Sequence, residues 1–200
     1  MIKIMLVEDQ TMLLGTMATL LDMYDDFSVI SKAKDGVEAI NFLKDNPVDI
    51  IITDLEMPNK TGLELAEDVK QHYPNIKVIV VTTFSRSGYL KRALDCGVKG
   101  YLLKDSPFEE LVDTIQRVHQ GETVVESNLA IAALTDKDPL TDKERKILRL
   151  VGNNLSNKEI ASTLFLGEGT VRNYISISIS KLNASNRVDA YRIAKENGWL

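Results

Sequence analysis

Three carboxylates stand where two apolar segments of the chain end. Glu8 and Asp9 directly follow the apolar residues 2–7, and Asp54 directly follows residues 49–53. If these segments are neighbouring parallel strands, their carboxyl ends meet at one edge of a sheet and the three carboxylates converge. Like charges this close repel one another unless a cation joins them, and Mg²⁺ suits a few carboxylates and several waters. The spacing therefore predicts a magnesium site.

A hydroxyl and an ammonium group follow two further apolar segments. Thr82 ends residues 77–82, and Lys104 directly follows residues 100–103. Beside a metal-bound carboxylate, these two groups can contact the oxygens of a phosphoryl group carried by that carboxylate. Each residue alone also fits an ordinary solvated loop, but five such groups after four strands favour a phosphorylation site.

The elements that must position these groups alternate along the first 120 residues. The pattern predicts strands at 2–7, 28–33, 49–53, 77–82 and 100–103, and helices at 10–23, 36–45, 62–72, 86–95 and 107–119. Nearly continuous apolar strands are typical of parallel sheets that helices cover on both faces. Five such units predict an α/β fold, a doubly wound five-stranded parallel sheet of flavodoxin-like type. A strand order of 2-1-3-4-5 would make strands 1 and 3 neighbours.

The pattern changes after residue 120. Residues 121–138 are predicted to be a linker with a short helical stretch at 128–134, and residues 139–200 a small all-α domain with helices at 142–153, 157–165, 168–182 and 187–197. Thr141 and Glu144 have the spacing of a capping box at the start of the first helix. Three helices with a glycine-containing turn fit a helix-turn-helix, although helix spacing alone favours a generic helical bundle.

Charge divides the chain in the same way. Residues 1–120 carry 13 Lys and Arg against 19 Asp and Glu, whereas residues 139–200 carry 10 against 6. An acidic front and a basic tail indicate two modules with different partners, the second a polyanion. No apolar run reaches the roughly 20 residues of a membrane span, the N-terminus lacks the pattern of a signal peptide, and Cys96 is the single cysteine. We therefore expect a cytoplasmic protein without membrane attachment.

The strand-end motifs together resemble the receiver domain of bacterial response regulators, over residues 1 to about 120. They are Leu-Val-Glu8-Asp9-Gln, Ile-Thr-Asp54-Leu-Glu56-Met-Pro58, Val-Val-Thr82-Thr and Gly100-Tyr-Leu-Leu-Lys104. The resemblance implies that Asp54 accepts a phosphoryl group from a sensor histidine kinase. It also implies that Mg²⁺ is bound by Asp54, by Asp9 directly and by Glu8 through water, with the backbone carbonyl of Glu56 as a further ligand.

The resemblance assigns roles to three more residues of this region. It implies that Thr82 and Lys104 contact the phosphoryl oxygens and that Tyr101 is the aromatic residue whose rotamer follows the switch. The family often has Lys-Pro where this chain has Lys104-Asp105. Haloacid-dehalogenase-type phosphatases also use an aspartate after a strand, but they place a second aspartate two residues later, where this chain has Glu56.

The tail resembles the LuxR-type DNA-binding domain, through Leu-Ser156-Asn157-Lys-Glu-Ile-Ala161 and Gly169-Thr170-Val-Arg172-Asn-Tyr-Ile-Ser176. A receiver followed by this tail is the arrangement of the NarL/FixJ subfamily of response regulators. The resemblance implies that Arg172, Asn173 and Ser176 face the major groove of double-stranded DNA and that Lys158, Thr170 and Lys181 lie near phosphates. Ser178 stands where the family usually has an apolar core residue, and Ile177 lies on the outer side.

A homodimer that forms on phosphorylation is expected to pair two tails on a two-fold DNA site. We expect the buried stripe of the helix at 10–23 to be made of Leu13, Met17, Leu20 and Leu21, and the segment 107–119 to be broadly apolar too. Exposed apolar area marks an interface. Leu14 and Ala18, which are four residues apart, widen the apolar stripe of the first of these helices sideways, and Leu111 and Ile115 belong to the apolar face of the second. The predicted dimer face is therefore Leu14, Ala18, Leu111 and Ile115.

The sequence thus predicts a transcription factor of a two-component system, which a kinase modifies, and not an enzyme. One alternative is an atypical receiver that works without phosphorylation and answers to a partner or ligand. Another is a LuxR-type autoinducer receptor, whose ligand domain would need an apolar, aromatic-lined pocket in place of the acidic cluster at the strand ends.

Overall fold

The computed structural model describes residues 1–200 with the exception of 84–86, 127–128 and 132–137. The chain divides into two compact units, one made mainly of residues 1–130 and the other mainly of residues 131–200. Among the described residues, no helix combines the length and the apolar character that crossing a membrane requires.

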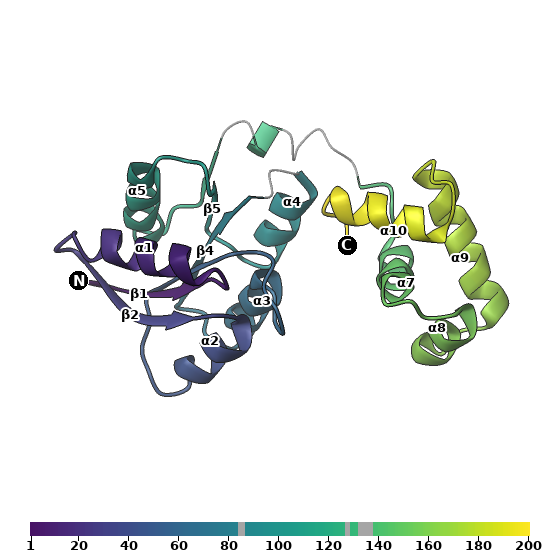
Figure 1. The fold of residues 1–200 in the computed structure, drawn as a ribbon, viewed down its shortest axis with the longest axis horizontal. Helices are drawn as coiled ribbons and strands as arrows, with labels where there is room; N and C mark the ends of the chain where they lie inside the picture. The colour runs from purple at the N-terminus through teal and green to yellow at the C-terminus, as the bar shows by residue number, and fades with distance from the viewer. Residues whose placement is uncertain (84–86, 127–128, 132–137) are drawn as a thin grey trace. The chain divides into compact units, whose positions relative to one another are not determined.

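The first unit is a parallel sheet covered by helices on both faces (Figure 1). Its strands run in the order β2-β1-β3-β4-β5-β6. They are β1 (Ile2–Val7), β2 (Phe27–Ala33), β3 (Ile50–Thr53), β4 (Lys77–Thr82), β5 (Gly100–Leu103) and β6 (Val124–Val125). The helices are α1 (Thr11–Leu21), α2 (Gly36–Leu43), α3 (Gly62–His72), α4 (Ser87–Asp95) and α5 (Phe108–His119). The α/β fold and the order 2-1-3-4-5 are confirmed.

A sixth strand departs from the five-stranded prediction. Val124 and Val125 pair in parallel with Gly100 and Tyr101, and the Val124 N–H donates to the Lys99 carbonyl. A strand of two residues is too short to show a periodic pattern, so the sequence suggested only a linker there. The predicted helical stretch at 128–134 lies mostly outside the described residues.

The predicted dimer face is wrong as a surface. Leu14, Ala18, Leu111 and Ile115 are all buried, in the core that α1 and α5 form against one face of the sheet. The buried residues of α1 are Leu14, Met17, Ala18 and Leu21, which follow the i, i+3, i+4, i+7 pattern of a helix face. The expected stripe was therefore rotated about the helix axis, and Leu13 and Leu20 are the leucines left partly exposed.

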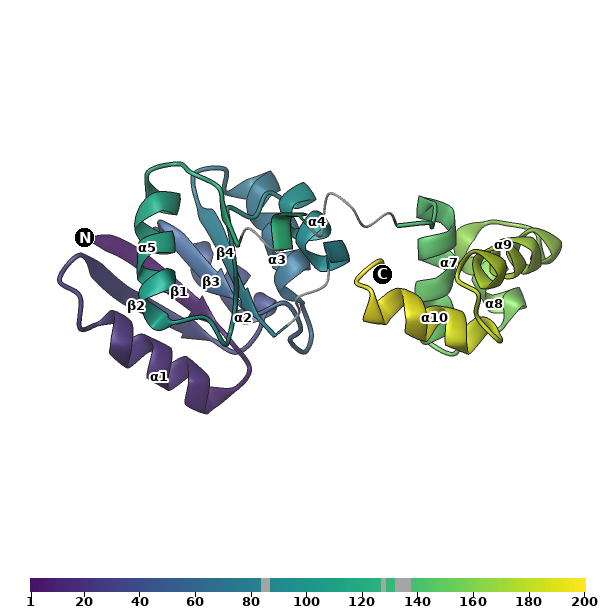
Figure 2. The ribbon, with the colours of Figure 1, turned by 90° about the horizontal axis from the view of Figure 1, so that it is seen from above.

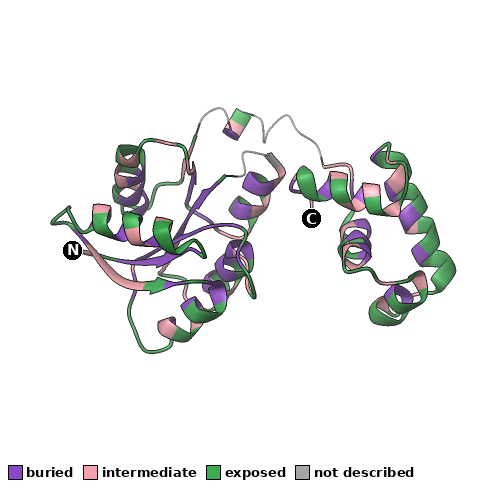
Figure 3. Cartoon of the chain, viewed as in Figure 1, coloured by how far each residue is buried: buried purple, intermediate pink, exposed green. Residues whose placement is uncertain are grey.

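In the second unit, residues 138–200 form four helices around two small apolar clusters, and Figure 2 shows the helices. They are α7 (Asp142–Gly152), α8 (Asn157–Leu164), α9 (Glu168–Lys181) and α10 (Arg187–Glu196). One cluster joins α7, α8 and α9, and the other joins α7 and α10 with the residues that follow α9. The burial pattern in Figure 3 shows each helix with a buried and an exposed side. The Ile-Ser alternation at 175–180 is helical, as expected, because Val171, Ile175 and Ser178 all face inward.

Candidate functional site

The carboxylates predicted to converge do so at the carboxyl edge of the sheet. Strands β1 and β3 are neighbours with Val7 opposite Thr53, so the residues that follow them lie side by side. Glu8, Asp9 and Asp54 each place a carboxylate oxygen within 4.8 Å of those of the other two. Glu8 and Asp54 are buried, whereas Asp9 is exposed. Two strand ends thus hold two carboxylates away from water and a third in contact with it.

Lys104 connects the two buried carboxylates. Its Nζ lies 2.8 Å from Glu8 Oε2 and 2.8 Å from Asp54 Oδ2. The Lys104 N–H donates to the carbonyl of Thr82, which is fully buried at the end of β4. The five groups that the sequence singled out therefore belong to one region, and a single lysine faces a surplus of negative charge.

Burial and the shared lysine both affect the proton affinities of the site. Burial raises the pKa of Glu8, and the hydrogen bond and positive charge of Lys104 only partly oppose this. Burial alone would lower the pKa of Lys104, but its hydrogen bonds to Asp54 and Glu8 outweigh that effect and raise it. A divalent cation would favour the ionised carboxylates for the same electrostatic reason. Carboxylate oxygens at this spacing are the donor set that Mg²⁺ takes.

The loop after β3 is fixed by a close backbone approach. The Asp54 Oδ1 accepts a 2.6 Å hydrogen bond from the N–H of Leu55, and the N–H of Gly62 donates to the Leu55 carbonyl. A Cβ atom at Gly62 would lie 1.9 Å from the carbonyl oxygen of Asp54, so only glycine fits there. The sequence predicted a helix start at Gly62 but missed this role. The Glu56 side chain is exposed in the same loop.

Tyr101 is almost completely buried on β5, between Val80 of β4 and Val125 of β6. Its part in a switch stays a prediction. A neighbour on its edge, β6, was itself not expected from the sequence.

The predicted DNA-contacting residues lie on the outer side of α9 and at the start of α8. Lys158, Thr170, Arg172, Asn173 and Ser176 are exposed. Arg172 has one intrahelical partner, Glu168, at 3.3 Å. The opposite side of α9 packs into the tail, and there Ser178 is fully buried with its hydroxyl donating to the Tyr174 carbonyl at 2.8 Å. This bond explains how the core accepts a serine at that position.

Lys181 differs from the other predicted phosphate contacts. Its Nζ donates to Glu144 Oε2 at 2.9 Å, and the Glu144 side chain is only 3% exposed. Burial alone would raise the pKa of Glu144, but bonds from Thr141 and Lys181 outweigh it and lower the pKa. Lys181 therefore pairs with a buried carboxylate while its own side chain is 33% exposed, and its predicted place near a DNA phosphate stays a prediction. Glu144 was identified in the sequence only as a capping residue.

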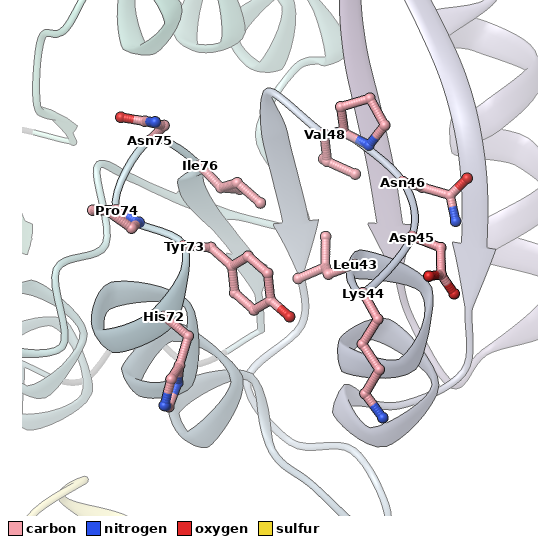
Figure 4. A pocket seen from close by; sticks show the side chains of 11 residues that line it. Leu43, Lys44, Asp45, Asn46, Val48, His72, Tyr73, Pro74, Asn75 and Ile76 are labelled. Carbon is pink, nitrogen blue, oxygen red and sulfur yellow. The ribbon is translucent and has the colours of Figure 1, made fainter.

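A separate hollow of about 420 Å³ lies at the opposite edge of the sheet, between the ends of α2 and α3 (Figure 4). Its titratable groups do not converge on it. His72 Nδ1 interacts with the carbonyl of Asp68, and the Lys44 Nζ donates to Asn41, each within its own helix. Binding sites of open α/β sheets lie at the carboxyl ends of the strands, so this hollow is not the functional site.

Comparison with known proteins gives this geometry its context. Residues 4–116 match the family of response regulator receiver domains. The chain belongs to the response regulators. Residues 138–194 match the luxR family of bacterial regulatory proteins, so the receiver is joined to a LuxR-type helix-turn-helix. These matches favour the response regulator over the phosphatase and autoinducer-receptor alternatives.

Full-length relatives have the same organisation. The chain is 46% identical to the transcriptional regulatory protein DesR of Bacillus subtilis (strain 168), over all 200 residues of both proteins. It is 28% identical to the solved response regulator ChrA of a heme-sensing two-component system, with a TM-score of 0.58 over 100% of this chain and 98% of that one. A structure of RcsB bound to DNA has the same fold, with 22% identity and a TM-score of 0.69 over 98% of each chain. The chain is thus a DNA-binding response regulator of a two-component system.

Proposed function

We propose that Asp54 accepts a phosphoryl group from the phosphohistidine of a sensor histidine kinase. A carboxylate oxygen of Asp54 forms the new bond to phosphorus, and the histidine nitrogen leaves. The observation that supports this is the position of Asp54, buried beside Glu8 and 2.8 Å from the Lys104 ammonium group. Lys104 is within reach of oxygens on a phosphoryl group carried by Asp54 and can offset their charge.

The same residues would hold Mg²⁺. Asp9, Asp54 and the backbone carbonyl of Glu56 would bind it, with Glu8 acting through water. When bound, the ion would supply positive charge to the phosphoryl oxygens. The exposed position of Asp9 beside two buried carboxylates leaves the cluster open to a hydrated ion. Thr82, at the adjoining strand end, would contact a phosphoryl oxygen, and the switch would reach Tyr101.

We further propose that phosphorylation favours a homodimer, whose paired tails bind two half-sites of double-stranded DNA. Arg172 and Asn173 would read base edges in the major groove, since Arg suits guanine and Asn suits adenine. Their exposure in the N-terminal half of α9 supports this assignment. The protein would then work in the cytoplasm, where the chromosome is, as a regulator and not as an enzyme with its own substrate.

Intact mass after treatment with acetyl phosphate and Mg²⁺ tests the phosphorylation. The wild type should gain the mass of one phosphoryl group, Asp54→Asn should gain none, and Asp45→Asn, a matched change at an exposed carboxylate of the same domain, should behave as wild type. Labelling of Asp54→Asn at the wild-type rate would contradict the assignment. A wild type that gains no mass would favour the atypical receiver.

DNA binding has its own test. Arg172→Ala should cost about 1–3 kcal/mol of specific affinity and relax base preference, whereas Lys158→Ala should weaken all duplexes alike and lower the salt dependence. Selection of bound duplexes from a random pool supplies the DNA for both measurements. Unchanged affinity of Arg172→Ala would show that α9 is not the reading helix.

A further inference from the structure

The turn between α8 and α9 carries an aromatic residue in an unusual conformation. Phe165 is 95% exposed, and its backbone lies in the left-handed region with φ 54° and ψ 45°. A lone exposed apolar side chain is common on protein surfaces. A bulky residue with positive φ is a genuine outlier, because its Cβ crowds the neighbouring carbonyl oxygen. The two features together call for an explanation.

The rest of the chain solves the same backbone problem differently. Among the described residues, the other non-glycine positions with positive φ are Asn59, Asn154 and Asn183. Asparagine tolerates this conformation because its short polar side chain bonds locally. Two of these asparagines follow the ends of α7 and α9, as Phe165 follows the end of α8. Phe165 therefore replaces the residue type that the backbone favours.

The fold of the tail does not depend on the Phe165 ring. The residues on either side of it, Leu164 and Leu166, pack against the cluster formed by α7, α8 and α9. The end of α8 is capped by backbone groups, since the Leu166 N–H donates to the Ala161 carbonyl and the Phe165 N–H donates to Ser162. Asparagine or glycine would make the same backbone bonds. The ring is kept at a conformational cost without a packing gain.

The place of Phe165 indicates what the ring contacts. It follows the last residue of α8 and lies three residues before Glu168, where α9 begins, and the first turns of α9 carry Thr170 and Arg172. In a helix-turn-helix, the N-terminal residues of the second helix enter the major groove. The apolar atoms that a duplex offers to a neutral ring beside that end are those of the sugars and the methyl groups of thymine.

We propose that Phe165 is a DNA-contacting residue whose ring packs against apolar atoms of the duplex beside the base pairs under α9. This inference rests on the proposed binding of DNA through α9. The contact is apolar, so it adds affinity without releasing counterions from the phosphates. The left-handed backbone at residue 165 is the conformation that presents the ring outward.

The test combines stability, affinity and salt dependence in the full-length protein treated with acetyl phosphate. The probe is a duplex selected from a random pool by the wild type. Phe165→Asn should melt at the wild-type temperature or above it, because the backbone strain is relieved, and should bind the duplex at least fivefold more weakly. Phe165→Trp should retain most of the affinity. Val37→Asn, which removes an exposed apolar side chain from the receiver, should change neither property.

Salt dependence separates this contact from a phosphate contact. Phe165→Asn should leave the slope of log affinity against log salt unchanged, whereas Lys158→Ala should reduce it by about one. A duplex with deoxyuridine in place of thymine distinguishes the two apolar targets. If the ring contacts thymine methyls, the wild type loses affinity for that duplex and Phe165→Asn does not; if it contacts deoxyribose, both proteins bind both duplexes in the same ratio.

Several outcomes would overturn the proposal. Unchanged affinity of Phe165→Asn alongside weakened binding by Arg172→Ala would remove Phe165 from the interface and leave the proposed function intact. Unchanged affinity of both variants would instead contradict DNA reading by α9. A lower melting temperature of Phe165→Asn would make the ring part of the fold. If Phe165→Asn sedimented differently from the wild type in the absence of DNA, Phe165 would contact a second copy of the chain instead.

Discussion

Each unit of this protein buries a carboxylate beside a lysine, with opposite consequences. In the receiver, Lys104 lies 2.8 Å from both Glu8 and Asp54, and Asp9 adds a third carboxylate. In the tail, Lys181 pairs with Glu144, the backbone N–H of Thr141 donates to the same carboxylate oxygen, and the Glu144 N–H donates to the Thr141 hydroxyl. The pKa of Glu8 is raised and that of Glu144 is lowered.

A functional cluster and a structural pair differ in how far the lysine offsets the burial and charge of the carboxylates around it. At Glu144 the charges balance and hydrogen bonds complete the pair, so the ionised form is favoured in the folded protein. At Glu8 burial outweighs the hydrogen bond and charge of Lys104, which also bonds Asp54, so the pKa is raised. A divalent cation added to this cluster would further favour the ionised carboxylates, as a phosphorylation site with bound Mg²⁺ requires.

A buried carboxylate with no partner at all is the extreme case. Leu14→Asp would place one in the core under α1, where Leu14 is 7% exposed. We expect a loss of about 4 kcal/mol or more in the free energy of unfolding of the receiver, because the charge is desolvated without compensation. Leu13→Asp places the charge one residue earlier, at a partly exposed position, and should lower the free energy of unfolding much less. Urea titration of the two variants measures both losses. Equal stability of the two variants would contradict the observed orientation of α1.

Mg²⁺ should add positive charge to the carboxylate cluster and so stabilise the receiver, and it should leave the stability of the tail unchanged. At about 100 times its dissociation constant, the ion would stabilise the receiver by about 2.7 kcal/mol. Differential scanning calorimetry should show a higher melting temperature for the wild type, and Asp9→Asn should lose that increase. Glu144→Gln should retain the increase in full. An Mg²⁺ effect that survives Asp9→Asn would place the ion elsewhere.

The strand-end cluster was predictable from the sequence because it depends on strand positions. Strands buried on both faces show as apolar runs, and the first polar residue after each run marks the functional edge. Glu8, Asp54 and Lys104 were found by this rule. The strand order 2-1-3-4-5 was expected only as a common order of doubly wound sheets, because alternation alone does not specify which strands are neighbours.

The sequence analysis was wrong about the direction of side chains on α1, and it did not indicate contacts between residues far apart in the sequence. Met17 and Leu21 belong to both the expected and the observed buried stripe of α1. The observed stripe is rotated about the helix axis relative to the expected one, so the other buried residues differ. The pairing of Lys181 with Glu144 joins positions 37 residues apart, and no local pattern encodes it. The short strand β6 and the close approach at Gly62 depend equally on contacts that only the folded chain provides.

The tail contains two capping boxes, one at the start of α7 and one at the start of α8. Glu144 and Glu159 both bond the N-cap residue of their helix, but only Glu144 is buried and paired with a lysine. Glu144→Ala should cost about 1–3 kcal/mol, since it removes a charge-assisted hydrogen bond and leaves Lys181 without its partner. Glu159→Ala should cost less. Urea unfolding followed by Trp199, the single tryptophan, which packs in the tail, measures both. Equal losses would mean that the buried pair adds nothing to the cap.

Acidification should affect the balanced pair in a defined direction. The pKa of Glu144 is below its ordinary value of 4.5 in the folded protein, so its contribution is complete above about pH 4.5 and is lost as the pH falls through the lower folded value. The stability difference between wild type and Glu144→Gln, followed by Trp199 fluorescence, should therefore narrow between neutral pH and pH values below 4.5. The coupling between Glu144→Gln and Lys181→Met in a double-mutant cycle should decrease over the same range, because a protonated carboxyl no longer attracts the ammonium group. A coupling that stays constant on acidification would mean that the pair does not contribute through its charge, and the contrast with Glu8 would then rest on burial alone.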